Sequence, residues 1–170
     1  MQVIETERLG LRWLTETDDE FILDLLNQPS WLEYIGDRGV KNLEDARAYI
    51  HNGPLAMISR HGFGLYLVEL KSGAIPIGLC GLLRREALED VDIGFAFLPD
   101  YCGRGYAREA AKACLEYARN ALGLERLAAI TLPTNKSSIR LLESLGMRHE
   151  RNVRLEENGE LLQLFAKQLR

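Results

Sequence analysis

The sequence predicts a mixed α/β (α+β) fold, in which about four helices flank a mostly antiparallel central sheet of about seven strands. Apolar runs typical of strands are separated by short polar turns such as Lys71–Ala74 and Glu156–Gly159, which makes those strands antiparallel neighbours. A long alanine-rich helix instead joins the strands predicted at residues 92–98 and 126–132, and such a crossover makes them parallel. Because 170 residues suit one hydrophobic core, we expect a single domain over residues 1–170.

The first third of the chain predicts one strand and two helices. The strand covers residues 5–12, where apolar and polar residues alternate. Thr17–Glu20 has the pattern of a capping box and begins a helix that ends before Pro29. Asn42 can cap the next helix, which Gly53-Pro54 interrupts before a short helical turn resumes.

A loop is predicted over residues 29–40, and it contains the large aromatic residues Trp31 and Tyr34. Aromatic residues in a loop either form a local cluster under the chain or line a binding surface. The residues alone leave both interpretations open.

The remaining strands and helices follow from the same patterns. Hairpin turns separate three consecutive apolar runs, so the sheet begins as a meander, and a second hairpin closes the chain. Asn and Gly residues mark the start and end of the last helix. The expected strands lie at residues 63–70, 75–83, 92–98, 126–132, 147–155 and 161–169, and the expected helices at residues 107–122 and 135–145.

A glycine-containing turn connects the strand at residues 92–98 to the long helix. Gly103 and Gly105 precede the first helical alanine, Ala107, and Gly123 stops the helix. Main-chain amides and the positive end of the helix dipole therefore converge at one place, which favours an anion. A tight turn without a ligand is the alternative that the loop alone leaves open.

The type of anion follows from the residues that the turn lacks. A dinucleotide fingerprint would need Gly or Ala at Arg108, and a nucleotide P-loop would need Gly-Lys-Ser/Thr. The remaining candidate is a pyrophosphate held by backbone amides, with Arg104 and Arg108 at the rim.

Composition argues against several other classes. The net charge of −4 disfavours nucleic-acid binding, and no apolar run approaches the ~20 residues of a membrane span. Three cysteines and three histidines stand at no metal-ligand spacing, so no metal is expected. The N-terminus lacks the apolar region of a signal peptide, and we expect a cytoplasmic protein, either monomer or homodimer.

Three segments resemble the GCN5-related N-acetyltransferases (GNAT), in particular their RimJ/RimL-type ribosomal-protein branch. Gly103–Ala107 is similar to the acetyl-coenzyme A turn, whose pattern is Gln or Arg, two residues, Gly, one residue, then Gly or Ala; Cys102 stands at the first position. Thr6–Leu9 resembles the opening strand of that branch. Asn135–Met147 resembles a second signature, in which Ser or Ala follows Asn after three residues and the helix ends in Leu-Gly-Phe, here with Met147 for Phe.

This resemblance implies the GNAT fold, with the sheet splayed between its fourth and fifth strands, and acetyl-CoA as cosubstrate. Main-chain groups near Phe97 and Leu98 would bind pantetheine or polarise the thioester carbonyl, and Asn135 would orient a cofactor amide or only cap its helix. Trp31 and Tyr34 would form a wall of the acceptor site. The pyrophosphate would be held by the amides of residues 103–108, namely Gly103, Arg104, Gly105, Tyr106, Ala107 and Arg108.

The resemblance further implies direct attack of an amine on the thioester in a ternary complex. Asp92 aligns roughly with the general base of some members, although a solvated carboxylate at a strand edge is equally open; Glu69 and Glu89 are further candidates. Leu142 replaces the tyrosine that many members use as the acid. Ser138 is therefore the candidate acid, its alternative being a serine packed against the cofactor.

Three functions remain open at this stage. The first is acetylation of a protein N-terminal amine of the ribosomal-protein type. The second keeps acetyl-CoA and takes a small-molecule amine such as an antibiotic, a polyamine or another metabolite. The third is a non-catalytic CoA-binding regulatory domain, which the missing tyrosine favours. Two lesser hypotheses are that Cys102 acts as a nucleophile and that Arg84-Arg85 contacts an acidic substrate. The simpler interpretation of the two arginines is a solvated face.

Overall fold

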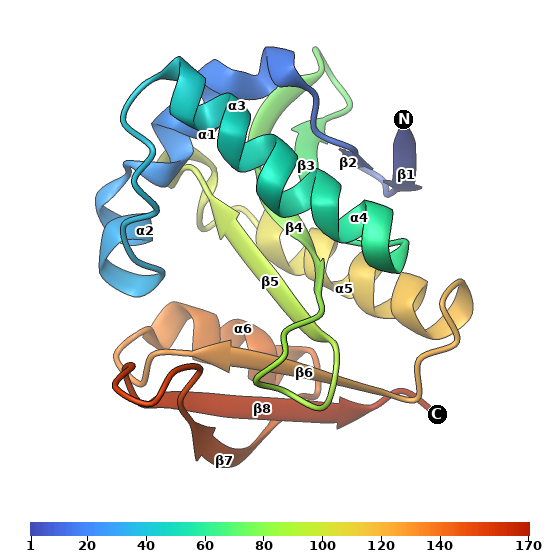
Figure 1. Ribbon diagram of the computed structural model, residues 1–170. Helices are drawn as coiled ribbons and strands as arrows, with labels where there is room; N and C mark the ends of the chain where they lie inside the picture. The colour runs from blue at the N-terminus through green and yellow to red at the C-terminus, as the bar shows by residue number, and fades with distance from the viewer.

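The computed structural model describes residues 1–170 and confirms the mixed α/β fold with one open, mostly antiparallel sheet (Figure 1). The strand order is β1-β2-β3-β4-β5-β6-β8-β7, and every neighbouring pair is antiparallel except β5 with β6. The strands are β1 (Gln2–Glu5), β2 (Leu9–Arg12), β3 (Leu65–Leu70), β4 (Ile75–Leu83), β5 (Asp92–Phe97), β6 (Arg126–Thr131), β7 (Arg148–Val153) and β8 (Leu162–Gln168).

Helices cover both faces of this sheet. Buried residues of α1 and α3 pack with Leu67 and Leu79 on one face, whereas those of α5 pack with Leu9 and Leu11 on the other, where α6 joins the same core beside β6. Each face of the meander is therefore shielded from water, as a sheet with two apolar faces requires. The helices are α1 (Asp19–Leu26), α2 (Pro29–Tyr34), α3 (Leu43–Ile50), α4 (Ala56–His61), α5 (Tyr106–Asn120) and α6 (Lys136–Ser144).

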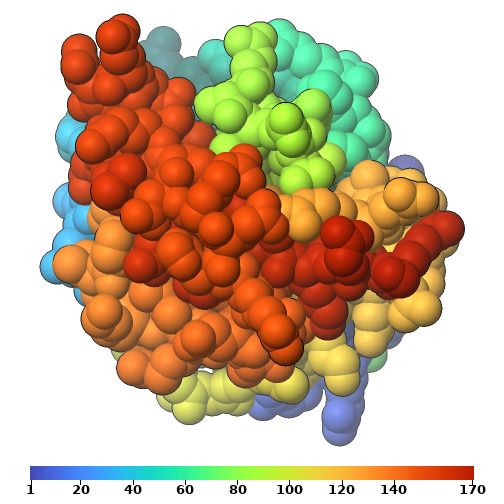
Figure 2. All heavy atoms as spheres, turned by 90° about the horizontal axis from the view of Figure 1, so that it is seen from below, coloured from blue at the N-terminus to red at the C-terminus, as the bar shows by residue number.

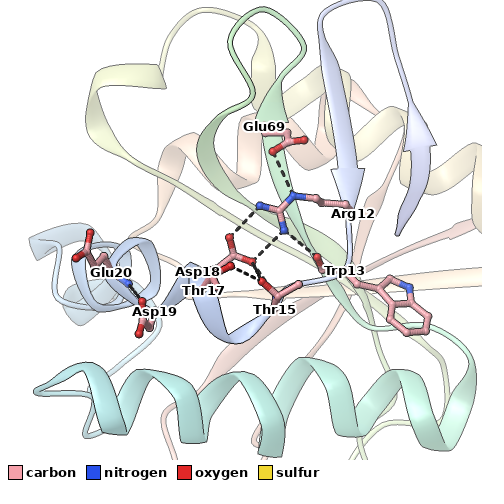
Figure 3. A network of polar contacts seen from close by, with 8 residues as sticks. All are labelled: Arg12, Trp13, Thr15, Thr17, Asp18, Asp19, Glu20 and Glu69. Atoms are coloured by element: carbon pink, nitrogen blue, oxygen red, sulfur yellow. Dashed lines mark hydrogen bonds and ion pairs between the residues drawn. The ribbon is translucent and has the colours of Figure 1, made fainter.

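The N-terminal segment differs from the prediction in two ways. The strand expected at residues 5–12 is instead the β1–β2 hairpin, which adds an eighth strand. The reciprocal cap lies two residues earlier than expected: the Thr15 amide donates to the Asp18 carboxylate at 2.8 Å. Figure 3 shows the reason, because Asp18 is also held by the Arg12 guanidinium, whose Nε donates to Glu69 on β3. This network fixes the start of α1 to the sheet.

The helix that begins after Asn42 is not interrupted at Gly53-Pro54, contrary to the prediction. A π-helical turn over His51–Leu55 continues α3 directly into α4, and Figure 1 shows one long helix. The wider turn accommodates Pro54, which has no amide to donate and whose ring would clash in a regular α-helix.

The segment expected as a loop over residues 29–40 contains α2 instead. Pro29 occupies the first turn, where a missing amide costs nothing, and Trp31 is buried in the cluster formed by α1 and α3. This burial supplies the tertiary packing that a helix of six residues needs.

The feature that positions the site is the divergence of β5 from β6. The two strands pair at a single position, Asp92 with Ala128, where the Ala128 amide donates to the Val91 carbonyl at 2.9 Å. Beyond this point they separate, as Figure 1 shows. The splay implied by the family resemblance is therefore present, and it leaves one side of β5 without a strand partner.

Candidate active site

A cavity of about 920 Å³ occupies the region where β5 and β6 diverge. It extends from α2 along β5 to the turn before α5, and it also reaches the first turn of α6. Ten of the predicted site residues line it: Trp31, Tyr34, Asp92, Phe97, Gly103, Gly105, Ala107, Arg108, Asn135 and Ser138. The fold thus brings the predicted cofactor, catalytic and acceptor residues to one cleft.

The turn before α5 presents six consecutive main-chain amides without an acceptor in the protein. The first helical hydrogen bond runs from the Glu109 amide to the Gly105 carbonyl at 3.0 Å, and none of the amides of residues 103–108 donates to the protein. Gly103 and Gly105 have φ values of 76° and 83°, which residues with a Cβ adopt at a cost. The 15 residues of α5 add their dipole, so this turn suits a diphosphate.

Three positive side chains share the cleft with these amides. Arg108, Lys136 and Arg140 line the same cleft, the last two from α6. Arg104 and Tyr106, also predicted for the cofactor, do not line it: the Arg104 guanidinium lies over the Tyr101 ring at 5.7 Å, and Tyr106 packs beneath Arg8. Their contribution to the site is therefore limited to main-chain groups.

The N-terminal hairpin holds the turn in place through Glu109. This carboxylate accepts hydrogen bonds from the Thr6 hydroxyl at 2.5 Å, the Arg8 amide at 2.9 Å and the Arg8 Nε at 2.7 Å. Burial raises the pKa of Glu109, but these donors outweigh it and hold that pKa below its ordinary value. The Arg8 guanidinium also donates to the Arg104 carbonyl at 3.1 Å, so the hairpin supports the turn from behind.

The main-chain amides of Phe97 and Leu98 differ in whether they are free to donate a hydrogen bond to a ligand. The Leu98 amide donates to the Ile77 carbonyl on β4 at 2.9 Å, so it cannot bind pantetheine, and Leu98 does not line the cleft. Amides of adjacent strand residues point to opposite sides, so that of Phe97 faces the gap left by β6. The expectation for Leu98 as a donor is wrong because β4 already satisfies it.

Asp92 stands at the start of β5 and is fully buried. Burial raises its pKa to about 6, although the nearby Arg85 guanidinium, whose Nε lies 3.0 Å from Oδ1, acts in the opposite direction. The alternative of a solvated carboxylate at a strand edge is therefore excluded. The interpretation of Arg85 as a solvated side chain is likewise wrong, because Arg85 lines the cleft beside Asp92.

The other candidate bases lie outside the cleft. Glu69 is held by Arg12 in the network of Figure 3. Glu89 is exposed on the β4–β5 connection, and Arg84 anchors that connection by donating to the carbonyls of Leu88 and Glu89 at 2.9 and 2.8 Å. Neither carboxylate lines the cleft.

The first turn of α6 places Asn135 and Ser138 at the cleft. The Asn135 side-chain oxygen accepts from the Ser138 amide at 3.2 Å, so Asn135 caps the helix, and its side-chain amide nitrogen remains free to donate. The half-buried Ser138 hydroxyl has no acceptor in the protein. Leu142 is buried at the position where the family resemblance implied a tyrosine.

Sequence reasoning missed part of the end of the cleft at which the predicted acceptor residues lie. Arg38, Tyr49 and Arg85 line the cleft together with Trp31 and Tyr34, although they come from three separate segments. No motif connects them, so only their position in the fold reveals them. Cys102 also lines the cleft, but burial raises the pKa of its thiol, which argues against a thiolate nucleophile.

Two general features complete the description. No group of three or more His, Cys, Asp or Glu side chains has an arrangement suited to a metal ion. No helix combines the length and apolar character needed to cross a membrane.

Comparison with known proteins gives the family. A family model described as an acetyltransferase (GNAT) domain matches residues 8–148. The chain is 32% identical over 152 residues to the protein YkkB of Bacillus subtilis strain 168, with 88% of this chain and 87% of that protein covered. An acetyltransferase of the GNAT family from Bacillus anthracis has a similar structure, with a TM-score of 0.82, 28% identity and 99% of each chain covered.

The fold extends to more distant structures. RimL, a ribosomal alpha-N-protein acetyltransferase in complex with coenzyme A, superposes with a TM-score of 0.83 over 99% of this chain and 98% of that chain, at 16% identity. The fold, the splayed strands and the family match agree. The chain belongs to the GCN5-related N-acetyltransferase (GNAT) family.

Proposed function

We propose that the protein transfers an acetyl group from acetyl-CoA to a primary amine, by direct attack in a ternary complex. The observation that carries this proposal is the run of six unpaired amides at residues 103–108, placed at the entrance to the gap between β5 and β6. The turn offers donors for a diphosphate, and the gap offers a strand edge for an extended pantetheine arm. One domain of residues 1–170 would hold both substrates.

Three features support a fit to acetyl-CoA. Gly103 leaves space for close approach of phosphate oxygens, since a Cβ there would meet nothing within 4 Å. Arg108, Lys136 and Arg140 supply positive charge to the same cleft. The Phe97 amide and the Asn135 side chain are donors along the path of the arm.

Asp92 and Ser138 would divide the proton transfers. The attacking nitrogen forms a bond to the acetyl carbon, and its proton passes to the Asp92 carboxylate, which is ionised above about pH 6. As the C–S bond breaks, the Ser138 hydroxyl donates a proton to the departing thiolate and recovers one through solvent. The Phe97 amide is the candidate donor to the oxyanion that forms between these steps.

The acceptor in this proposal is the N-terminal amine of a protein, as in the RimJ/RimL-type enzymes. RimL, whose fold is similar, acts on a ribosomal protein. Trp31 and Tyr34 would form the wall against which the acceptor lies. A cytoplasmic location and a monomeric or homodimeric state stay predictions.

The proposal is tested by titrating the protein with acetyl-CoA in a calorimeter and then measuring thiol release on a panel of amines and N-terminal peptides. Binding followed by amine-dependent release is the expected result. Binding without release on any amine would support a CoA-binding regulatory domain instead. Release on small amines alone would redirect the proposal to a metabolite.

A further inference from the structure

A second cavity of about 510 Å³ adjoins the cleft. The two cavities share Tyr49, Leu65, Leu83 and Arg85 as lining residues, so they meet at the acceptor end. The π-helical turn between α3 and α4 forms part of its wall, and the β4–β5 connection forms another part. Figure 2 shows these two segments against each other, the connection in light green and the helix in blue-green.

Positive charge predominates at this junction, although the whole protein carries a net charge of −4. Three arginines, Arg60, Arg84 and Arg85, line the second cavity with one acidic residue, Glu86, although Arg84 also donates to main-chain carbonyls and Arg85 also pairs with Asp92. Arg38 adds a fourth guanidinium from the cleft side. An arginine cluster of this kind in a cavity favours an anionic oxygen group.

Tyr49 supplies a neutral donor at the point where the cavities meet. Burial raises the pKa of Tyr49 to about 12, while the positive charges of Arg38 and Arg85 lower it, so both guanidinium groups act on this hydroxyl. The hydroxyl remains protonated at neutral pH, and burial and the two positive charges act on it without any hydrogen bond from the protein. Three donors from α3, the 35–42 segment and the β4–β5 connection therefore converge.

Arg85 connects this junction to the reacting centre. Its Nε donates to Asp92, and its two Nη atoms have no partner in the protein. An anion bound by these Nη atoms would therefore lie close to the proposed base, separated by the width of one guanidinium group. The spacing requires only a short linker between the anion and the amine that Asp92 deprotonates.

We infer that the acceptor carries a carboxylate or phosphate near its amine, and that Arg38, Tyr49 and Arg85 bind this anionic group. This inference rests on the proposed function for the identity of the reacting amine. A requirement for an anionic group on the acceptor also excludes plain polyamines as substrates. Their second charged group is positive and would face the arginine cluster.

Binding to the CoA-saturated protein tests the inference without relying on turnover. Calorimetry would compare O-phosphoethanolamine with ethanolamine, β-alanine with β-alaninamide, and the Ala-Asp-Ala peptide amide with the Ala-Asn-Ala peptide amide. We expect at least one anionic member to bind roughly 10-fold more tightly than its neutral partner, because hydrogen bonds to a charged group add affinity. The three pairs separate phosphate, small carboxylate and peptide sources.

Substitutions decide whether the junction is responsible. Arg38→Met and Tyr49→Phe should each reduce the preference at least threefold, whereas Arg119→Met, which removes the same charge from a surface lining neither cavity, should leave it unchanged. Equal binding of all charged and neutral partners, or a preference that survives in the Arg38→Met, Tyr49→Phe double variant, would overturn the inference. A preference without thiol release would overturn the proposed function alone.

Discussion

The proposed cofactor end and the proposed acceptor end of the cleft are built in different ways. At the cofactor end, six consecutive main-chain amides converge within one turn. At the acceptor end, side chains come from α2, α3, the segment between them and the β4–β5 connection. A site made of consecutive backbone groups is fixed by glycine positions and a helix start, whereas a site made of side chains depends on how distant segments pack.

The largest expected effect concerns Asp92, which belongs to the acceptor end, where side chains form the site. Asp92→Asn should lower kcat roughly 100-fold, because a general base contributes on that order. In the wild type, kcat should fall as the pH drops through about 6, since protonation removes the acceptor of the proton. The pH profile of kcat, measured with saturating acetyl-CoA, checks this.

Stability provides an independent check on the same carboxyl group. Because its pKa is raised in the folded state, the folded protein binds the proton more tightly than the unfolded chain does between about pH 4 and pH 6. The free energy of unfolding should therefore decrease by about 3 kcal/mol as the pH rises through this range. Asp92→Asn should remove this decrease, and an acidic limb of kcat that persists in that variant would remove Asp92 from the mechanism.

The second effect tests the cofactor end, where main-chain amides form the site. Gly105→Val places a Cβ at a φ of 83° and 3.3 Å from the Arg8 guanidinium, so the turn must move away from the geometry that binds the diphosphate. The strained conformation costs about 2 kcal/mol. If binding must restore it, KM for acetyl-CoA should rise roughly 30-fold. Gly123→Val, at a φ of 66° just beyond the other end of α5, is the matched control. Equal losses in both variants would mean that the turn acts only through stability.

The difference between the two ends also explains which parts of the structure the sequence predicted correctly. The glycine spacing, the helix from Ala107 and the parallel crossover were all predictable, because each follows from residues close together in the chain. Leu98 was misassigned because the partner of its amide, Ile77, lies in another strand. Arg85 was taken for a solvated residue because nothing in its neighbourhood in the sequence indicates the distance to Asp92.

Two helical errors have a similar cause. The π-helical turn at His51–Leu55 and the short helix α2 both depend on tertiary packing that overrides a local signal for a break or a loop. The helix α2 lines the proposed acceptor end of the cleft, and the π-helical turn lines the second cavity that adjoins it. Local rules therefore failed where the acceptor site is formed and succeeded where the cofactor turn is formed.

A smaller effect is expected at Ser138, where the cofactor and acceptor ends meet. Ser138→Ala should lower kcat about 10-fold and leave the Kd for acetyl-CoA nearly unchanged, because water at the same place relays a proton less well. Ser144→Ala, which removes a hydroxyl from the exposed side of the same helix, is the control. An unchanged kcat, or a loss confined to Kd, would assign Ser138 to cofactor packing.

The smallest effect tests the support behind the turn. Glu109→Gln keeps the size of the side chain but removes the charge that Thr6 and Arg8 hold, so KM for acetyl-CoA should rise about threefold with little change in kcat. Glu116→Gln, on the exposed side of α5, is the comparison variant. If Glu109→Gln lowers kcat and leaves KM unchanged, the hairpin does not act through the turn.

The most direct test of the backbone-held diphosphate is an amide NMR titration with coenzyme A, and a parallel one with pantetheine, which lacks the diphosphate. The amide signals of residues 103–108 should move most with coenzyme A and remain nearly still with pantetheine, whereas that of Phe97 should respond to both. If coenzyme A binds while those six signals stay in place, the diphosphate is held elsewhere and the account of this site is wrong.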